Sequence, residues 1–200
     1  SAASDVYKRQ LILRREMPSG NPICDDPLLD RLYRSRHIKN SQELDRTLAS
    51  MHNPNLMSGV DSAVKLLVES YQKQQRIVIV GDFDADGATS TALAVLALRQ
   101  LGFVNVTYLV PNRFEQGYGL SVAVAQEALA LDVELLITVD NGVSSHEGVA
   151  FLKTQGVKVI VTDHHLPPET LPNADAIVNP NLAHCGFPSK NLAGVGVTFY

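Results

Sequence analysis

Beyond residue 59, the hydrophobic residues alternate between helical and strand-like spacing. Apolar side chains recur every three or four residues from Val60 to Tyr71, which predicts a helix, and a β-branched run ending at Gly81 predicts a buried strand directly after it. The alternation continues along the chain. It predicts further helices at about 88–101, 121–131 and 145–155, and further strands at about 104–110, 134–140, 157–162 and 175–179.

The predicted strands contain almost only apolar residues, as in 135–139 and 157–161. A strand of this kind is typical of a parallel sheet whose two faces are both covered. We therefore expect an α/β fold with a doubly wound, mostly parallel five-stranded sheet and helices on both faces. A short helical lead-in precedes it, with a Ser-capped helix at about 41–51. The expected organisation is a disordered or artefactual tail at 1–10, a lead-in at 11–57 and the α/β domain at 58–200.

Composition excludes several classes of protein. The chain has 200 residues, of which 45% are hydrophobic and 19% are charged, so that a disordered chain is excluded. Its apolar runs are shorter than a membrane span needs, and no signal segment opens the chain, so we expect a cytoplasmic protein without membrane contact. Cys24 and Cys185 are too few for a disulfide framework or a zinc ribbon.

The charge is distributed unevenly. The net charge is −4, and the acidic excess lies in residues 76–200, whereas residues 1–75 are slightly basic. An acidic segment binds a polyanion poorly unless its carboxylates surround divalent cations. The position of the carboxylates therefore decides whether nucleic acid remains a candidate partner.

Three carboxylates follow the first predicted strand, where residues 81–87 read Gly-Asp-Phe-Asp-Ala-Asp-Gly. In an extended segment Asp82, Asp84 and Asp86 would point to one side, and three like charges at close range favour a hard divalent cation. The alternative is a solvated acidic turn in which Asp86 caps the helix that follows.

Two later strands also end in residues that bind metals. Asp140 ends the strand at 134–140, and Asp163-His164-His165 follows the strand at 157–162. Ligands bind beyond the carboxyl ends of the strands in such a sheet, so we expect these side chains to form one site. Carboxylate oxygens together with imidazole favour Mn²⁺ or Mg²⁺ over a thiolate-bound metal.

The number of these ligands favours two ions. Asp140 is the candidate bridge between two cations, an arrangement used for in-line displacement at phosphorus. Since adjacent residues point in different directions, we assign His164 to the metal and His165 to a phosphate oxygen, with the reverse order left open.

Two glycine-containing segments complete the list of candidates. Arg113, in the loop at 111–121, is a candidate phosphate clamp or an ordinary exposed loop residue, and Ser121 is a candidate helix cap. Gly194 and Gly196 lack the third glycine of a dinucleotide-binding fingerprint, so no nucleotide cradle is predicted there.

Taken together, these segments resemble the DHH phosphoesterase superfamily. The resemblance lies in 80–90, 109–119, 138–142 and 161–165, and with 179–181 and 187–196 the chain resembles most the bacterial single-strand-specific DNA exonucleases of that superfamily. It implies a 5′→3′ exonuclease that depends on two Mn²⁺ or Mg²⁺ ions and degrades single-stranded DNA in repair and recombination. It also implies a single-strand-binding protein and a helicase as partners.

The resemblance also implies roles for single residues. Asp84, Asp86, Asp140 and His164 correspond to metal ligands, and His165 corresponds to a residue near the scissile phosphate. Asp82 stands where relatives carry Asn, and Val80 where they carry His, so Asp82 either supports a ligand or replaces one.

The resemblance further implies that the α/β domain, a DHH domain, is incomplete at its C-terminal end. Related enzymes continue with another metal-binding Asp, a second domain and an oligonucleotide-binding barrel, so we expect this fragment to be weakly active or inactive. Two alternatives stay open. One is another DHH phosphoesterase, either an oligoribonuclease or a pyrophosphatase, and the other is a non-catalytic metal-binding module.

Overall fold

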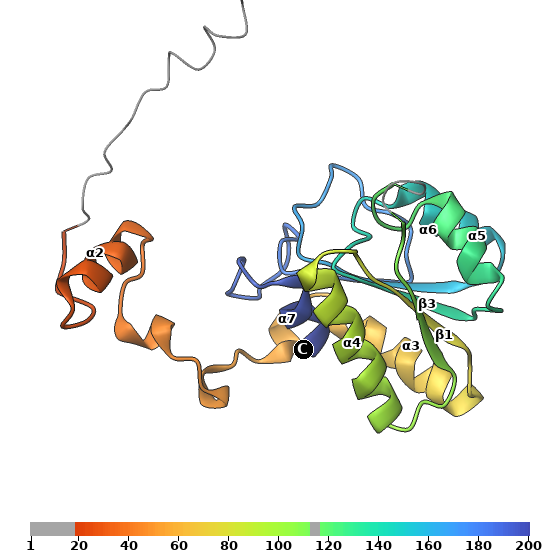
Figure 1. The fold of residues 1–200 in the computed structure, drawn as a ribbon, viewed down its shortest axis with the longest axis horizontal. Coiled ribbons are helices and arrows are strands. Elements are labelled where there is room, and N and C mark those ends of the chain that lie inside the picture. Colours follow the sequence, from red (N-terminus) through yellow and green to blue (C-terminus); the bar gives the residue numbers. More distant parts are fainter. Residues whose placement is uncertain (1–18, 113–116) are drawn as a thin grey trace, which may run out of the picture. The chain divides into compact units, whose positions relative to one another are not determined.

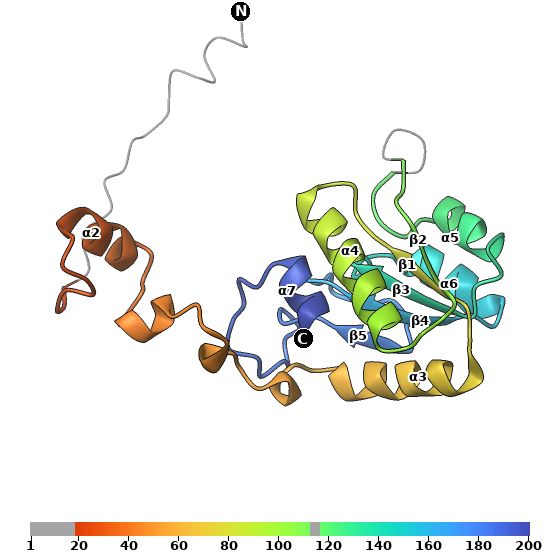
Figure 2. The same cartoon turned by 60° about the horizontal axis from the view of Figure 1, so that its bottom comes forward.

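The computed structural model describes residues 19–112 and 117–200, and its strands form a single parallel sheet (Figures 1 and 2). The strands are β1 (Ile77–Val80), β2 (Val106–Leu109), β3 (Leu135–Val139), β4 (Lys158–Thr162) and β5 (Ala176–Val178). Their order is β2-β1-β3-β4-β5, and each neighbouring pair is parallel. The predicted fold class is therefore confirmed.

The strand order reverses at β1. The chain passes from β1 to β2 on one side and then returns to place β3 on the other side of β1, with Val80 paired to Thr138 near the carboxyl ends. A doubly wound sheet has its ligand crevice at such a switch point, because the two connections leave the sheet in opposite directions. The residues that follow β1 and β3 therefore lie next to each other at this crevice.

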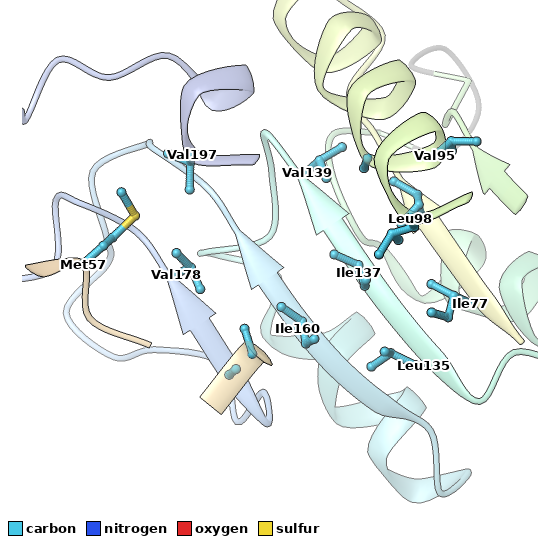
Figure 3. Close-up of a cluster of buried hydrophobic side chains, with 14 of the residues drawn as sticks. Met57, Ile77, Val95, Leu98, Leu135, Ile137, Val139, Ile160, Val178 and Val197 are labelled. Atoms are coloured by element: carbon cyan, nitrogen blue, oxygen red, sulfur yellow. The ribbon is translucent and has the colours of Figure 1, made fainter. Parts of the chain in front are cut away.

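Helices cover both faces of the sheet (Figures 1 and 2). One face carries α3 (Val60–Lys73), α4 (Ala85–Gln100) and α7 (Gly194–Phe199), and the other carries α5 (Val122–Leu129) and α6 (His146–Thr154). Alternate residues of each buried strand contribute to two separate hydrophobic clusters. In Figure 3, Ile77, Ile137 and Ile160 belong to the cluster that α4 covers through Val95 and Leu98.

The chain divides into two compact units, Ser1–Met51 and His52–Tyr200. The described part of the first contains α2 (Pro27–Ser35) and the 3-10 helices η2 (Ser41–Leu44) and η3 (Leu48–Ser50), and the second begins with η4 (Pro54–Leu56). The domain boundaries expected from the sequence stay a prediction. None of the helices in the described ranges combines the length and apolar character that a membrane crossing requires.

The prediction of one helix at 41–51 is wrong. Asp45 is extended, and its carboxylate accepts a hydrogen bond from the backbone N–H of Thr47 at 2.9 Å, so the segment breaks into two short 3-10 turns. Asp favours this local hydrogen bond over the helical one. The helix α2 was not predicted, although Asp26 caps it and Pro27 occupies its first position, both of which are ordinary start signals.

Candidate metal centre

The turn after β1 presents two carboxylates at the switch point. Asp84 is the N-cap of α4, because its carboxylate accepts a hydrogen bond from Gly87 N at 2.9 Å. The interpretation in which Asp86 caps this helix is therefore wrong. Asp82 is buried, and its Oδ1 accepts a hydrogen bond from Phe83 N at 2.7 Å. A Cβ at position 87 would lie 2.4 Å from the carbonyl oxygen of Asp82, so only glycine lets the helix begin this close to the strand.

Asp86 turns instead toward a segment 108 residues later in the chain. Its Oδ2 accepts a hydrogen bond from Gly194 N at 2.7 Å, and its Oδ1 accepts one from Val195 N at 2.8 Å. These two amides open α7. Oδ2 of Asp86 also lies 3.6 Å from Nε2 of His164, so one carboxylate connects the first turn of α4 with α7 and with His164.

Asp140, directly after β3, is buried and has an unusual backbone conformation. The residue is 2% exposed and its φ is +62°, in the left-handed region that few residues other than glycine adopt. Its Oδ1 has no hydrogen-bond partner among the described residues. Nε2 of His164 lies 3.1 Å from that oxygen, but not in the alignment that a hydrogen bond requires.

The surroundings of Asp140 favour a positive ligand. Burial, followed by the charges of Asp86 and Asp84, raises the pKa of Asp140 to about 7. A buried carboxylate that lacks a hydrogen-bond donor and faces other carboxylates is unfavourable unless a cation compensates its charge. The orphaned oxygen therefore fits a divalent cation.

Asp163 organises the two histidines after β4. Its Oδ1 accepts hydrogen bonds from the backbone amides of His164 (2.7 Å) and His165 (3.0 Å) and from Nδ1 of the His165 ring (2.7 Å). Its Oδ2 accepts a hydrogen bond from Val143 N at 2.9 Å. Burial opposes the protonation of His165, but the hydrogen bond and charge of Asp163, with the charge of Asp140, raise the pKa of His165 above its ordinary value.

The potential ligand atoms form two overlapping groups. Within each group one ligand atom per residue lies within 4.8 Å of the others, and the groups are Asp140, His164, His165 and Asp82, Asp84, Asp140. Asp140 belongs to both. The donor set of carboxylate oxygens and imidazole nitrogens suits Mn²⁺ or Mg²⁺, and the shared carboxylate suits two neighbouring ions. The geometry also brings a ring nitrogen of His165 within 4.8 Å of Asp140, although sequence reasoning separated the roles of the two histidines, and Nε2 of His164 lies closer, at 3.1 Å.

A cleft of about 750 Å³ opens beside these residues, lined among others by Asp82, Phe83, Asp84, Tyr118, Asp163, His165 and the loop 142–146. The Tyr118 hydroxyl lies 3.4 Å from ring nitrogens of His165 and 3.4 Å from the carbonyl oxygen of Asp140. Ser121 caps α5 as predicted, through a hydrogen bond from Val124 N. Arg113, the candidate phosphate clamp, lies outside the described residues.

Sequence reasoning missed several residues that support the site. Asp163 was noticed only as part of a motif. The glycine pair at 194 and 196 was rejected as a nucleotide-binding loop and otherwise entered only the family resemblance, without a role at the site. The side-chain amides of Asn179 and Asn181 donate to the carbonyl oxygens of His165 and His164. The available signal was the polar Asn-Pro-Asn run at 179–181 after the last strand, at the same edge of the sheet.

Comparison with known proteins decides the family. A family model described as the DHH family, N-terminal domain, matches residues 76–200. The chain belongs to the DHH family. The superfamily resemblance drawn from the sequence motifs is therefore confirmed, and the parallel sheet with its strand-end acids and histidines is the DHH domain.

Within the DHH family, the chain is similar to proteins named RecJ. The chain is 73% identical over 192 residues to the single-stranded-DNA-specific exonuclease RecJ of Haemophilus influenzae, and the match covers 96% of this chain and 33% of that protein. A crystal structure of exonuclease RecJ bound to manganese matches with a TM-score of 0.65 and 38% identity, over 72% of this chain and 36% of that one. The crystal structure of RecJ from Thermus thermophilus in complex with Mn²⁺ matches with a TM-score of 0.65 and 34% identity, over 84% and 23%. The chain spans about a third of the length of these curated relatives.

Proposed function

We propose that this chain carries the metal-binding part of the active site of a 5′→3′ exonuclease that hydrolyses terminal phosphodiesters of single-stranded DNA in repair and recombination. One observation carries the proposal. Carboxylates and imidazoles that follow three neighbouring strands converge at the switch point of the sheet, around the orphaned oxygen of Asp140. Relatives that are named single-stranded-DNA-specific exonucleases, and RecJ structures that hold Mn²⁺, support it.

The proposed ligands for two Mn²⁺ or Mg²⁺ ions are Asp84, Asp86, Asp140 and His164, with Asp82 as a supporting or additional ligand. When bound, such ions neutralise the charge of a phosphodiester and activate water for in-line attack. Asp140 is proposed to serve both ions, because it belongs to both groups of ligand atoms.

The proposed role of His165 is to donate a hydrogen bond to a phosphate oxygen. Its Nδ1 is held by Asp163, which fixes the ring and leaves Nε2 as the second donor when the ring is protonated. Since His165 lines the cleft, a phosphate held there would have its nucleotide in the adjoining space of about 750 Å³. Tyr118 also lines that space, and Arg113 is proposed as a second phosphate contact.

The resemblance to RecJ proteins also underlies the proposed partners. We expect single-stranded DNA as the substrate, a single-strand-binding protein and a helicase as protein partners, and a cytoplasmic location. The acidic balance of residues 76–200 agrees with a site that depends on cations, since without them it would repel a polyanion.

The metal assignment is tested first, with the 200-residue chain and the electron paramagnetic resonance signal of free Mn²⁺. We expect the chain to bind Mn²⁺ and Asp140→Asn to weaken that binding by about 10-fold or more, since a central anionic ligand is lost. The matched control is Asp61→Asn on the exposed surface of α3, which should bind like the parent chain. A folded parent chain that binds no Mn²⁺, or an Asp140→Asn variant that binds normally, would overturn the assignment.

The reaction is tested with oligonucleotides labelled at the 5′ or the 3′ end, single-stranded or duplex, together with a dinucleotide and inorganic pyrophosphate. We expect slow release of mononucleotides from the 5′ end of the single strand, lost in Asp140→Asn. Preferential hydrolysis of the dinucleotide or of pyrophosphate would replace the proposal with another DHH activity. Because the chain spans about a third of the length of its relatives, the decisive result is Mn²⁺ binding without turnover of any of these substrates both in this chain and in one extended to their length, which would replace the proposal with a metal-binding module.

A further inference from the structure

The glycine pair near the end of the chain has no role in the proposed reaction, yet its first member contacts two of the proposed ligands. Gly194 is buried at the start of α7, and its N–H donates to Oδ2 of Asp86. A Cβ at position 194 would lie 2.4 Å from Oδ1 of Asp140 and 2.7 Å from both Cβ and Cγ of that residue. Contacts this short do not occur, so a side chain at position 194 is incompatible with the present position of Asp140.

We propose that Gly194 is a positioning residue of the metal centre: it lets the first turn of α7 lie against Asp140 while the amides of Gly194 and Val195 hold Asp86. This inference rests on the proposed function, because it takes Asp86 and Asp140 to be metal ligands. It assigns a role to a glycine for which the sequence predicted no nucleotide-binding function.

The contacts of Asp86 show why its orientation depends on this glycine. Each oxygen of the carboxylate accepts one backbone N–H of α7, at 2.7 Å and 2.8 Å. These two bonds fix the plane of a side chain that is 23% exposed and would otherwise rotate in solvent. If α7 moved outward to admit a side chain at 194, both bonds would lengthen and Asp86 would lose its position 3.6 Å from Nε2 of His164.

The contact with Asp140 constrains the second ligand in the same way. Oδ1 of Asp140 is the oxygen without a hydrogen-bond partner among the described residues, and it is also the atom closest to the missing Cβ of Gly194. A larger residue would turn this carboxylate away or displace α7, and either movement changes the geometry offered to a cation. One glycine therefore sets the relative position of two carboxylates that follow different strands.

Gly196 provides a matched comparison in the same helix. A Cβ there would meet the side chain of Leu192, with Cδ1 at 2.5 Å and Cγ at 2.8 Å, so Leu192 would have to shift, but no carboxylate of the metal centre is among the atoms that it would meet. Neither Gly194 nor Gly196 has a positive φ, so alanine is sterically acceptable to the backbone at both positions. The two substitutions therefore differ mainly in what the new methyl group touches.

The experiment measures Mn²⁺ binding by electron paramagnetic resonance for the 200-residue chain, Gly194→Ala and Gly196→Ala. Both the free-ion signal and the spectrum of bound Mn²⁺ are recorded. We expect Gly194→Ala to weaken binding by about 10–100-fold and to change the bound spectrum, as is typical when support of a metal ligand is lost. Gly196→Ala should leave both unchanged.

A second measurement keeps the proposal testable if Gly194→Ala folds poorly. The metal-free melting temperature is measured for Gly194→Ala in the parent chain and in an Asp140→Gly background, where the atoms that the methyl group would meet are absent. We expect Gly194→Ala to lower the melting temperature much less in the Asp140→Gly background. An equal loss in both backgrounds would show that the contact with Asp140 is not the cause, and would overturn the inference.

The outcomes separate this inference from the proposed function. If the parent chain and both glycine variants bind Mn²⁺ equally with the same bound spectrum, Gly194 has no positioning role and the proposed function stands. If the folded parent chain binds no Mn²⁺, the proposed function fails and the inference fails with it.

Discussion

Replacement of Asp163 by Asn tests whether one buried carboxylate holds the histidines and the cleft loop together. Oδ1 of Asp163 accepts three hydrogen bonds from residues 164 and 165, and Oδ2 accepts one from Val143 N. The residue is 1% exposed, so water cannot take over any of these bonds. Asparagine offers one oxygen in place of two, and its NH₂ group must face at least one of the four donors.

The magnitude follows from this arrangement. With the oxygen kept at the three-donor position, the amide of Val143 loses its acceptor, and a buried donor without a partner costs about 1–3 kcal/mol. The remaining three bonds become neutral, and neutral bonds are roughly half as strong as charge-assisted ones. Relief of the repulsion between Asp163 and Asp140 offsets part of this loss. We expect a net loss of about 2 kcal/mol, or about 4–8 °C in melting temperature for a domain of this size.

The assay is thermal unfolding by circular dichroism in the presence of a chelator, followed by Mn²⁺ titration. Asp163→Asn should also weaken Mn²⁺ binding by about 10-fold or more, since it weakens the hydrogen bonds that hold the ring of His165 and the backbone of His164. Asp61→Asn, exposed on α3, is the control and should change the stability by less than about 0.5 kcal/mol. If Asp163→Asn has the same melting temperature as the control variant and binds Mn²⁺ as tightly as the parent chain, the organising role of Asp163 is refuted.

Two further substitutions test the frame around the site. Although burial opposes it, hydrogen bonds from Lys153, Val159 and Lys158 lower the pKa of Asp175. A carboxyl group with a lowered pKa stabilises the folded state at pH values above its unfolded pKa of about 4, and this stabilisation is lost as the pH falls through the folded pKa. Chemical denaturation should therefore show Asp175→Asn to be about 1–2 kcal/mol less stable than the parent chain at pH 7. The difference should shrink below about pH 4. Phe187→Ala, which removes a fully buried ring, should cost about 3–5 kcal/mol in the same assay, and a loss below about 1 kcal/mol would contradict the packing described.

The fold was largely predictable because the sheet is buried on both faces. A strand such as 135–139 must be apolar at every position, and this leaves a signal that does not depend on its neighbours in space. The secondary structure of the lead-in was less predictable, because it depends on weak local interactions. At Asp45 a single side-chain hydrogen bond to Thr47 N ends the helical segment, and a hydrophobic pattern does not reveal such a bond.

The acids and histidines of the candidate centre were predictable for a topological reason. Parallel strands end at one edge of the sheet, so polar residues directly after buried strands must gather there. The supporting contacts were not predictable, since they join distant segments. Gly194 contacts Asp86 and Asp140, and the contact with Asp86 spans 108 residues; nothing in the spacing of Gly194 and Gly196 indicates which of them touches a carboxylate.

The same reasoning predicts that Asp140 costs the metal-free chain stability. Its Oδ1 is buried without a hydrogen-bond donor among the described residues, and its backbone is left-handed, which Asn tolerates at least as well as Asp. Asp140→Asn should therefore raise the melting temperature in the presence of a chelator, since it removes a buried negative charge that lies close to other carboxylates. Saturating Mn²⁺ should reverse the order, because a ligand at about 100 times its dissociation constant stabilises the parent chain by about 2.7 kcal/mol and the variant hardly at all. A metal-free variant less stable than the parent would mean that the Asp140 carboxylate has a stabilising partner in the folded chain, and the argument for a cation at its free oxygen would fail.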